Sequence, residues 1–453
     1  MIINWPRATS RRTVLGSAAA LAGVACGQAR PAASAPAFPL RVAAGGTYLE
    51  DSGGRPFLLQ GDTAWSLIVQ LRFEEAENYL QDRRARGFNS LLVNLIEHKY
   101  AARAPANIYG DPPFVGRGGF SDPNEAYFAH ADRILRRTAE LGFLVLLAPA
   151  YIGYGGGDEG WYRSMLAAGP SRLRAYGDYV GRRFGNRDNI MWVHAGDFDP
   201  PERSSVLSVA EGILRHDRTA LNTAHCAPET AAAEFWGGQP WLNVDTVYTY
   251  QPVYRAARRA ARRRPRRPYF LIESTYENEH GVTEERLRTQ AYQALLNGAF
   301  GQVFGNNPIW HFGTPGREAP MTWRQALDAE GSRGMQHLVR LFERIPWWQL
   351  EPDLGTALLP EGAGEPNGRQ SAARTRDGRF ALVHTPEGNL VTLDPSRLAA
   401  PIVQARWFDP SDGSLTPAQS RRSERAGWQD FAPPGRNRSG SRDWILEISA
   451  HAR

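Results

Sequence analysis

Strand-like and helix-like segments alternate eight times between residues 57 and 312, and this alternation limits most strongly how the chain can fold. The strand-like runs are nearly continuous in apolar residues, which is typical of parallel strands covered on both faces. Eight such units predict an α/β fold, a (β/α)8 or TIM barrel. The expected strands cover residues 57–65, 89–97, 143–151, 189–197, 221–227, 244–251, 268–274 and 300–312.

The pattern changes after Ile345. Short alternating runs such as FALVHTP and DWILEIS are separated by turns rich in Pro, Asp and Gly, which predicts a small antiparallel β-sandwich. A chain of 453 residues also exceeds the usual size of one hydrophobic core. We therefore expect an export signal and tether over 1–37, a catalytic barrel over 38–345, and a sandwich over 346–453.

The first residues resemble an export leader. A pair of arginines, Arg11 and Arg12, precedes a short apolar run, as in twin-arginine signals. The segment ending at Cys26 resembles a lipobox, which makes Cys26 a candidate for lipid attachment, while cleavage near residues 29–35 is the alternative. The sequence thus predicts an exported protein that is periplasmic, a cell-surface lipoprotein or secreted.

Charge gives no sign of a nucleic-acid partner. The formal net charge is +6, and Lys99 is the only lysine. The one dense basic run, from Arg255 to Arg267, alternates with alanine and is expected to be the solvated face of a helix, with a polyanion site as the alternative. The two cysteines, Cys26 and Cys226, predict no disulfide framework.

Two of the expected strands end on a carboxylate. NIMWVHAGDFD stops at Asp197 and RPYFLIESTYE stops at Glu273. Unpaired charges are costly to bury, so acids at these positions indicate a reactive cleft, and glycoside hydrolysis needs two facing carboxylates. Strands four and seven are not neighbours, so the two side chains would face each other across the barrel mouth. We assign Asp197 as general acid/base and Glu273 as nucleophile; caps or ion pairs with Arg are the structural alternative.

Other polar and aromatic residues fall where the expected strands end, which is the active-site face of such barrels. They are predicted to bind substrate: Asp62, Trp65, Asn94, Glu97, His98, Tyr250, Glu277, Asn306 and Trp310. His194 is expected to be a structural histidine. HExxH, paired-cysteine and G-x-S-x-G patterns do not occur, so neither a metal, a cofactor nor a serine nucleophile is expected.

These motifs together resemble the apiosidase-like glycoside hydrolases of the clan A type. The resemblance rests on QGDTAW, YLQDRRARGFNSLLVN, WVHAGDFD, IESTYE and FGNNPIW, and it covers about residues 38–345. It implies that Asp197 is the acid/base and Glu273 the nucleophile. The C-terminal part resembles the β-sandwich known as the collagen-binding domain of a collagenase. FGNNPIWHF departs from the family pattern, which leaves the substrate open.

The resulting prediction is an exported glycoside hydrolase that cleaves plant or bacterial polysaccharide with retention of configuration. A carboxylate separation clearly above about 5.5 Å would instead indicate inversion. The alternative function is a non-catalytic carbohydrate-binding lipoprotein on a degenerate barrel. Loops 98–123 and 152–169 are expected to decide between exo and endo action.

Overall fold

The computed structural model describes residues 35–450, except 117–118, 315–317, 356 and 365–367. The predicted twin-arginine leader and Cys26 lie outside the described residues. From Pro36 onward the chain forms one compact unit. Within the described part, no helix combines the length and apolar character needed to cross a bilayer.

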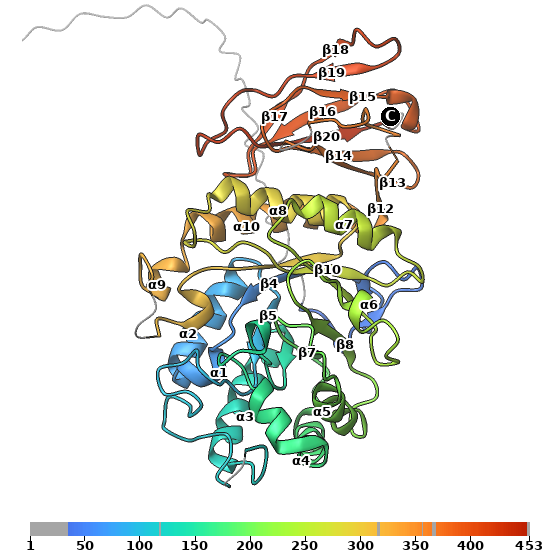
Figure 1. The fold of residues 1–453 in the computed structure, drawn as a ribbon. Coiled ribbons are helices and arrows are strands. Elements are labelled where there is room, and N and C mark those ends of the chain that lie inside the picture. Colours follow the sequence, from blue (N-terminus) through green and yellow to red (C-terminus); the bar gives the residue numbers. More distant parts are fainter. Residues whose placement is uncertain (1–34, 117–118, 315–317, 356, 365–367, 451–453) are drawn as a thin grey trace, which may run out of the picture. The chain divides into compact units, whose positions relative to one another are not determined.

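Eight parallel strands form the barrel predicted from the sequence (Figure 1). Their order in the sheet is β8-β7-β6-β5-β4-β11-β10-β9. The strands are β4 (Leu59–Thr63), β5 (Ser90–Asn94), β6 (Leu144–Ala148), β7 (Ile190–Ala195), β8 (Leu221–His225), β9 (Asp245–Tyr248), β10 (Tyr269–Glu273) and β11 (Gly301–Phe304). The last strand is shorter than expected, because the chain turns after Phe304 into a 3-10 helix, η2 (Ile309–His311).

Alternate residues of each strand face the barrel interior and the helices. In β6, Leu144 and Leu146 belong to the interior cluster, whereas Val145 and Leu147 pack with the helix layer. This is the two-residue period of a strand whose two faces are both apolar. It explains why the strand sequences are nearly continuous in apolar residues.

The first and last strands of the sheet order, β8 and β9, are joined through threonine side chains. The hydroxyl of Thr223 donates to the backbone oxygen of Val244 at 2.8 Å, and that of Thr246 donates to Ala224 at 2.8 Å. These bonds satisfy the backbone carbonyl groups of Val244 and Ala224, and they connect β8 to β9 so that the barrel is closed.

Helices connect the strands and surround the barrel (Figure 1). They are α1 (Leu67–Gln70), α2 (Phe73–Ala85), α3 (Glu125–Glu140), α4 (Tyr162–Phe184), α5 (Ser204–Leu214), α6 (Ala232–Phe235), α7 (Val253–Arg262), α8 (Glu284–Leu296), α9 (Trp323–Ala326) and α10 (Glu330–Glu343), with a 3-10 turn, η1 (Tyr154–Gly156). Gly87, Gly142 and Gly298 have positive φ just after helices, as expected of C-terminal caps.

Helices α4 and α5 approach each other unusually closely. A Cβ added at Gly177 would lie 2.2 Å from the backbone oxygen of Val209, and one at Gly212 would lie 2.4 Å from that of Arg174. Only glycine permits this approach, because any side chain would overlap the facing backbone.

A short antiparallel sheet precedes the barrel. Its strands are β1 (Arg41–Val42), β2 (Leu49–Glu50) and β3 (Pro56–Phe57). Leu49 and Phe57 join the same apolar cluster as the barrel interior, together with Phe300. The sheet therefore extends the interior core beyond the strands themselves.

The C-terminal part is antiparallel, as predicted. One sheet has the order β12-β13-β14-β20-β16-β17 and the other β15-β19-β18. The elements are η3 (Trp347–Gln349), β12 (Leu350–Pro352), β13 (Ser371–Thr375), β14 (Phe380–Thr385), β15 (Val391–Leu393), η4 (Pro395–Arg397), β16 (Gln404–Phe408), β17 (Leu415–Pro417), β18 (Ser420–Arg422), β19 (Gln429–Phe431) and β20 (Trp444–Ser449). Trp407, Leu446 and Phe431 pack between the sheets.

Buried charges join this sandwich to the barrel. Arg288 on α8 and Asp443 before β20 have fully buried side chains and form a two-pronged ion pair at 2.7 and 2.8 Å. Arg344 after α10 pairs with Glu447 on β20. An arginine that pairs with a carboxylate through two hydrogen bonds fixes the relative orientation of the two segments as well as their distance.

Candidate active site

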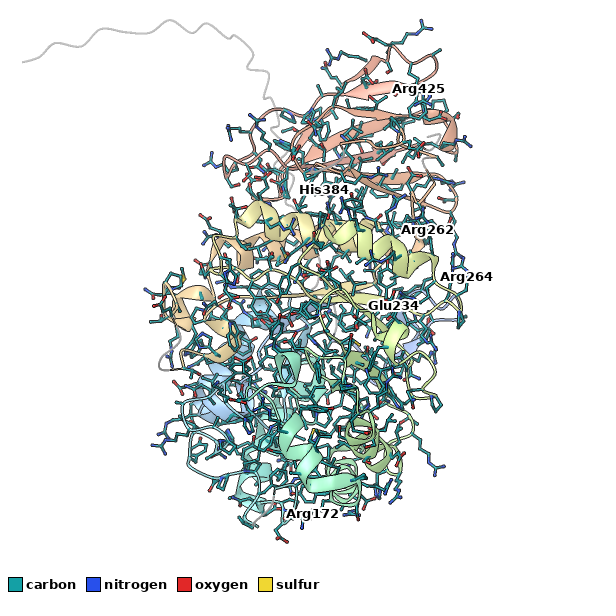
Figure 2. The ribbon with its side chains drawn as sticks, viewed as in Figure 1. Arg172, Glu234, Arg262, Arg264, His384 and Arg425 are labelled. Atoms are coloured by element: carbon teal, nitrogen blue, oxygen red, sulfur yellow. The ribbon has the colours of Figure 1, made fainter. Side chains whose placement is uncertain are left out.

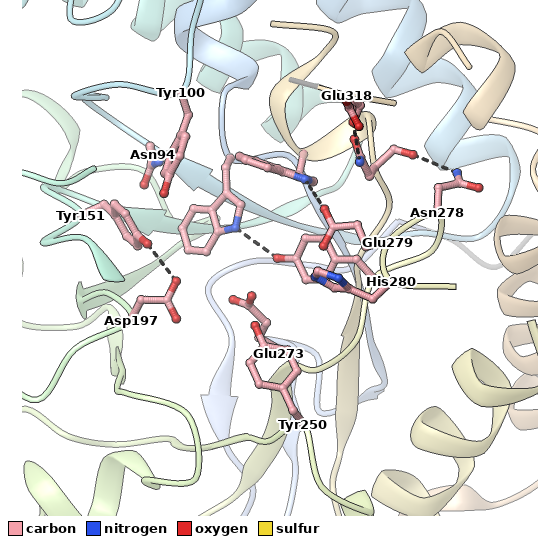
Figure 3. Close-up of a pocket in the computed structure, with 14 residues that line it drawn as sticks. Asn94, Tyr100, Tyr151, Asp197, Tyr250, Glu273, Asn278, Glu279, His280 and Glu318 are labelled. Carbon is pink, nitrogen blue, oxygen red and sulfur yellow. Dashed lines mark hydrogen bonds between the residues drawn. The ribbon is translucent and has the colours of Figure 1, made fainter. Parts of the chain in front are cut away.

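A pocket of about 500 Å³ opens at the C-terminal ends of the barrel strands (Figure 3). It is surrounded by six aromatic residues, by three carboxylates besides Asp197, and by several amide or imidazole groups. The lining residues are Trp65, Asn94, Tyr100, Tyr151, Asp197, Tyr250, Glu273, Tyr276, Asn278, Glu279, His280, Asn307, Trp310 and Glu318. Both acids predicted to carry the chemistry therefore belong to one pocket.

Asp197 is presented by an unusual stretch of backbone. Ala195, Gly196 and Asp197 all have positive φ, at 66°, 141° and 54°. A Cβ at Gly196 would lie 2.3 Å from the ring of Tyr151, so only glycine lets this ring approach. The Tyr151 hydroxyl then donates to Oδ2 of Asp197 at 2.8 Å, which fixes the carboxylate (Figure 3). Oδ1 is buried and has no hydrogen-bond partner among the described residues.

Glu273, the last residue of β10, is held by His225 from the end of β8. The backbone N–H of Asp197 donates to Nδ1 of His225 at 3.0 Å. Nδ1 must therefore be the unprotonated nitrogen, and Nε2–H donates to Oε2 of Glu273 at 2.8 Å. One buried imidazole thus links the backbone of one acid to the side chain of the other.

Electrostatics couple the two acids. Burial, and then the negative charge of Asp197, raise the pKa of Glu273 to about 7, although the hydrogen bond from His225 acts in the opposite direction. Burial lowers the pKa of His225, but its hydrogen bond to Glu273 and the charges of both acids outweigh this and raise it. The negative charge of Asp197 therefore acts on Glu273 directly and helps to keep this carboxyl protonated at a higher pH than usual.

Asp197, His225 and Glu273 each offer one atom that could bind a metal ion, and these three atoms lie within 4.8 Å of one another. That spacing is compatible with a metal ion, which the sequence did not indicate. However, both ring nitrogens of His225 are engaged in hydrogen bonds, so a metal could bind this histidine only by breaking one. The donor set fits a proton-carrying pair better than a metal centre.

Four of the predicted substrate-binding residues line the pocket: Trp65, Asn94, Tyr250 and Trp310. Nε1 of Trp65 donates to the hydroxyl of Tyr276 at 3.3 Å, and Nε1 of Trp310 donates to Glu279 at 2.9 Å. These bonds hold the indole rings in fixed orientations at the pocket wall.

The structure contradicts the prediction for Asp62. Its side chain is fully buried and faces α2, where Tyr79 donates to Oδ2 at 2.8 Å and Arg83 lies at 3.5 Å. Alternation explains this position: Leu59 belongs to the interior cluster, so residues at odd positions of β4 face inward and Asp62 faces the helices. Asp62 is a structural ion-pair partner.

Glu97 and His98 also lie outside the pocket lining. Glu97 is buried and accepts a hydrogen bond from the Ser66 hydroxyl at 2.9 Å. The ring of His98 packs edge-on against Trp161, and its Nδ1 lies 2.8 Å from the backbone oxygen of Asp158. Both residues organise the loop after β5 and do not line the pocket.

Glu277 and Asn306 bond to each other instead of lining the pocket. Nδ2 of Asn306 donates to Oε2 of Glu277 at 2.6 Å, and the backbone N–H of Gly331 donates to Oε1 at 2.6 Å. Because Gly331 is in the first turn of α10, Glu277 caps that helix with a charge of favourable sign. The neighbouring Asn307 occupies the pocket wall.

Three residues that were not predicted from the sequence, Tyr151, His225 and Tyr276, orient the acids and the indole ring of Trp65. Each follows or ends a barrel strand, or lies three residues past one, which was the available signal. His194, expected to be structural, is buried, and its Nε2 lies 2.9 Å from Oδ1 of Asn222. Cys226 is buried and forms no disulfide bond among the described residues.

A (β/α)8 barrel whose pocket holds one acid just after β7 and another at the end of β10 is the arrangement expected of a glycoside hydrolase, and the comparisons agree. The chain belongs to the family of apiosidase-like catalytic domains, whose model matches residues 43–349. Residues 355–449 match the domain described as "Putative collagen-binding domain of a collagenase". This family membership favours the enzyme over the non-catalytic alternative.

Solved structures share the fold. One, a glycoside hydrolase, is 23% identical, with a TM-score of 0.80, and the match covers 92% of this chain and 99% of that one. A family 5 glycoside hydrolase from Bacteroides vulgatus is 22% identical, also with a TM-score of 0.80, covering 92% and 94%. No curated protein sequence matches the chain.

Proposed function

We propose that this glycoside hydrolase acts with retention of configuration, with Asp197 as general acid/base and Glu273 as nucleophile. Glu273 attacks the anomeric carbon while Asp197 gives its proton to the departing glycosidic oxygen. Asp197 then takes a proton from water, which displaces Glu273 from the sugar. The proton that Asp197 loses with the leaving group in the first step is thus replaced by one from water in the second, and Glu273 is released as a carboxylate.

The observation that carries this proposal is the closeness of the two acids. An oxygen of Asp197 and an oxygen of Glu273 lie within 4.8 Å of each other. Retaining enzymes hold their carboxyl groups about 5 to 5.5 Å apart, whereas inverting enzymes leave several ångströms more for a water molecule. The spacing therefore favours direct attack by a carboxylate.

The hydrogen bonds favour this division of roles. Glu273 receives the Nε2–H of His225, which stabilises its ionised form. In Asp197, Oδ2 accepts from Tyr151, while Oδ1 has no hydrogen-bond partner in the described part of the chain and is the atom suited to carry the proton. When Asp197 holds that proton, it no longer repels the charge on Glu273.

The substrate we propose is a plant or bacterial polysaccharide outside the cytoplasm. Indole and phenol rings on several sides of the pocket, including Trp65, Tyr100 and Trp310, suit the apolar faces of sugar rings. The twin-arginine-like leader supports export, and Cys26 supports attachment to lipid.

The test is hydrolysis of a polysaccharide panel by the full chain and by two variants, Asp197→Asn and Glu273→Gln. We expect each variant to lose at least about a thousandfold in kcat/KM, because each removes a group needed in the transition state. Asp199→Asn is the matched control, since Asp199 lies two residues further on, accepts from Ala227 N–H and does not line the pocket. Full activity in either active-site variant would refute the assignment.

A further inference from the structure

A second concavity lies far from the catalytic pocket, beside the N-terminal ends of β10 and β11. Its volume is about 220 Å³, and its walls come from the segments before these strands and from η3 and β12. Gly298, which has a φ of 108°, forms part of the wall, and a Cβ there would approach Tyr269 and Pro352 within 3.4 Å. A side chain at this position would therefore crowd the wall of the hollow.

The exposed indole of Trp348 forms one side of this hollow. The side chain is 38% exposed, which is unusual for tryptophan, and its ring is held edge-on by Trp347 at a centroid distance of 6.2 Å. Trp347 is in turn braced by Tyr48. A rigid, accessible aromatic ring is suited to stacking against a sugar face at little entropic cost.

Guanidinium groups supply a positive charge around Trp348. Arg266, Arg267 and Arg376 line the hollow, and Glu351 is the single carboxylate among the lining residues. Glu351 already forms an ion pair with Arg376, in which Nε of Arg376 lies 2.8 Å from Oε1 of Glu351. Arg267 donates to the backbone oxygens of Leu242 and Gly237, and no carboxylate of the described residues forms an ion pair with it.

The basic run from Arg255 to Arg267, expected to be a solvated helix face, therefore has two parts. Arg258 and Arg262 donate to backbone oxygens at 353–354, and Arg263 pairs with Asp245, so these three are structural. Beyond them, Arg264 and Arg266 are exposed, and Figure 2 labels Arg262, the last residue of α7, and Arg264 just after it. The second part extends the positive field of the hollow.

We propose that this hollow is a non-catalytic binding site for a carboxylated saccharide, such as one uronic acid unit of an acidic polysaccharide. The face of the sugar stacks on Trp348, and its carboxylate is bound by Arg266 with support from the field of Arg264 and Arg267. A guanidinium binds a carboxylate through two parallel hydrogen bonds, which neutral sugars cannot match. This site is independent of the proposed catalytic roles.

The test is calorimetric titration of the full chain with digalacturonate and with the neutral digalactose of the same linkage, at physiological salt. We expect the acidic dimer to bind at least about tenfold more tightly than the neutral one. Trp348→Ala and Arg266→Gln should each weaken its binding about tenfold or more. Trp348→Phe should retain most of it, because a ring remains to stack.

Arg136→Gln on α3 is the matched control, since Arg136 is exposed and lies outside the hollow, and it should bind as the parent does. Hydrolysis of a small soluble substrate should be unchanged in the Trp348 and Arg266 variants, while Glu273→Gln should still bind digalacturonate. Absence of binding, equal binding of the neutral dimer, or binding unaffected by Trp348→Ala would overturn the proposal. The proposal would also be overturned if inorganic polyphosphate bound as tightly as digalacturonate and if this binding were unchanged in Trp348→Ala. That result would mean that the arginines bind any polyanion and that the tryptophan recognises no sugar.

Discussion

At the scale of single residues, the site depends on one buried imidazole that connects two acids. His225 accepts from the backbone of Asp197 and donates to the side chain of Glu273, so its tautomer is fixed. The sequence pointed to both acids because each ends an apolar strand. It could not assign this role to His225, because a histidine in a strand has the same appearance whether its ring only packs, as that of His194 does, or links the backbone of one acid to the carboxylate of another.

The raised pKa of Glu273 predicts a pH-dependent gain in stability for Glu273→Gln. The folded protein holds this proton up to about pH 7, whereas the ordinary pKa is 4.5, so ionisation opposes folding as the pH rises between these values. The variant should exceed the parent in free energy of unfolding by up to about 3 kcal/mol above pH 7, and by almost nothing below pH 4.5. Denaturant unfolding across this pH range measures the difference.

Glu424→Gln, at an exposed position of the sandwich, should show no such trend. A difference between Glu273→Gln and the parent that shrinks as the pH rises would contradict the assigned direction of the pKa shift.

The hydrogen bonds of His225 also predict that activity needs no metal. Because neither ring nitrogen has a free lone pair in the bonded arrangement, chelation should remove nothing from the site. Dialysis against EDTA should leave kcat within the error of the untreated enzyme, and added Zn²⁺ should not raise it. Loss of activity on chelation, restored by a divalent ion, would show that Asp197, His225 and Glu273 act as metal ligands.

At the scale of elements, the period of apolar residues was enough to predict the eight strands, but not which side chains reach the pocket. Phe270 and Ile272 face the barrel interior, so strict alternation would turn Glu273 toward the helices. The pairing with β9 shifts by one residue between Leu271 and Glu273, and this bulge accompanies the placement of Glu273 in the pocket. A bulge of this kind depends on two strands together, so one strand's sequence does not reveal it.

The close packing of α4 and α5 predicts that Gly177→Ala is strongly destabilising. The added methyl group would overlap the backbone oxygen of Val209, which cannot move without disturbing α5. We expect a loss of about 2 to 4 kcal/mol in the free energy of unfolding, as for other overpacked sites. Thermal or urea unfolding measures it.

Ser171→Ala is the control, because Ser171 is an exposed position of the same helix. Equal stability of the two variants would mean that α4 and α5 can separate without cost, and would contradict the glycine argument.

At the scale of the whole molecule, buried ion pairs make the sandwich part of the fold. The change in sequence pattern after Ile345 predicted the second domain. It could not predict that Arg288 of the barrel contacts Asp443 of the sandwich, because residues 155 positions apart leave no local signal in the sequence. Arg288→Met should therefore lower the free energy of unfolding by about 3 to 5 kcal/mol, because it leaves a buried carboxylate unpaired. Unfolding followed by tryptophan fluorescence should show one transition for barrel and sandwich together.

The double variant Arg288→Met/Asp443→Leu removes both charges and should recover most of that loss. Two separate transitions in the parent protein, or a single variant as stable as the double one, would show that the sandwich is an independent appendage.

The most direct measurement of the central claim is azide rescue of two active-site variants on an aryl glycoside that the parent enzyme hydrolyses. With Glu273→Ala, azide should take the place of the missing carboxylate and give a glycosyl azide of inverted configuration. With Asp197→Ala, azide should instead attack the glycosyl-enzyme and give the azide with the configuration of the substrate. Nuclear magnetic resonance of the products distinguishes the two anomers. The same anomer from both variants, or no azide product while the parent remains active, would contradict the paired roles of Asp197 and Glu273.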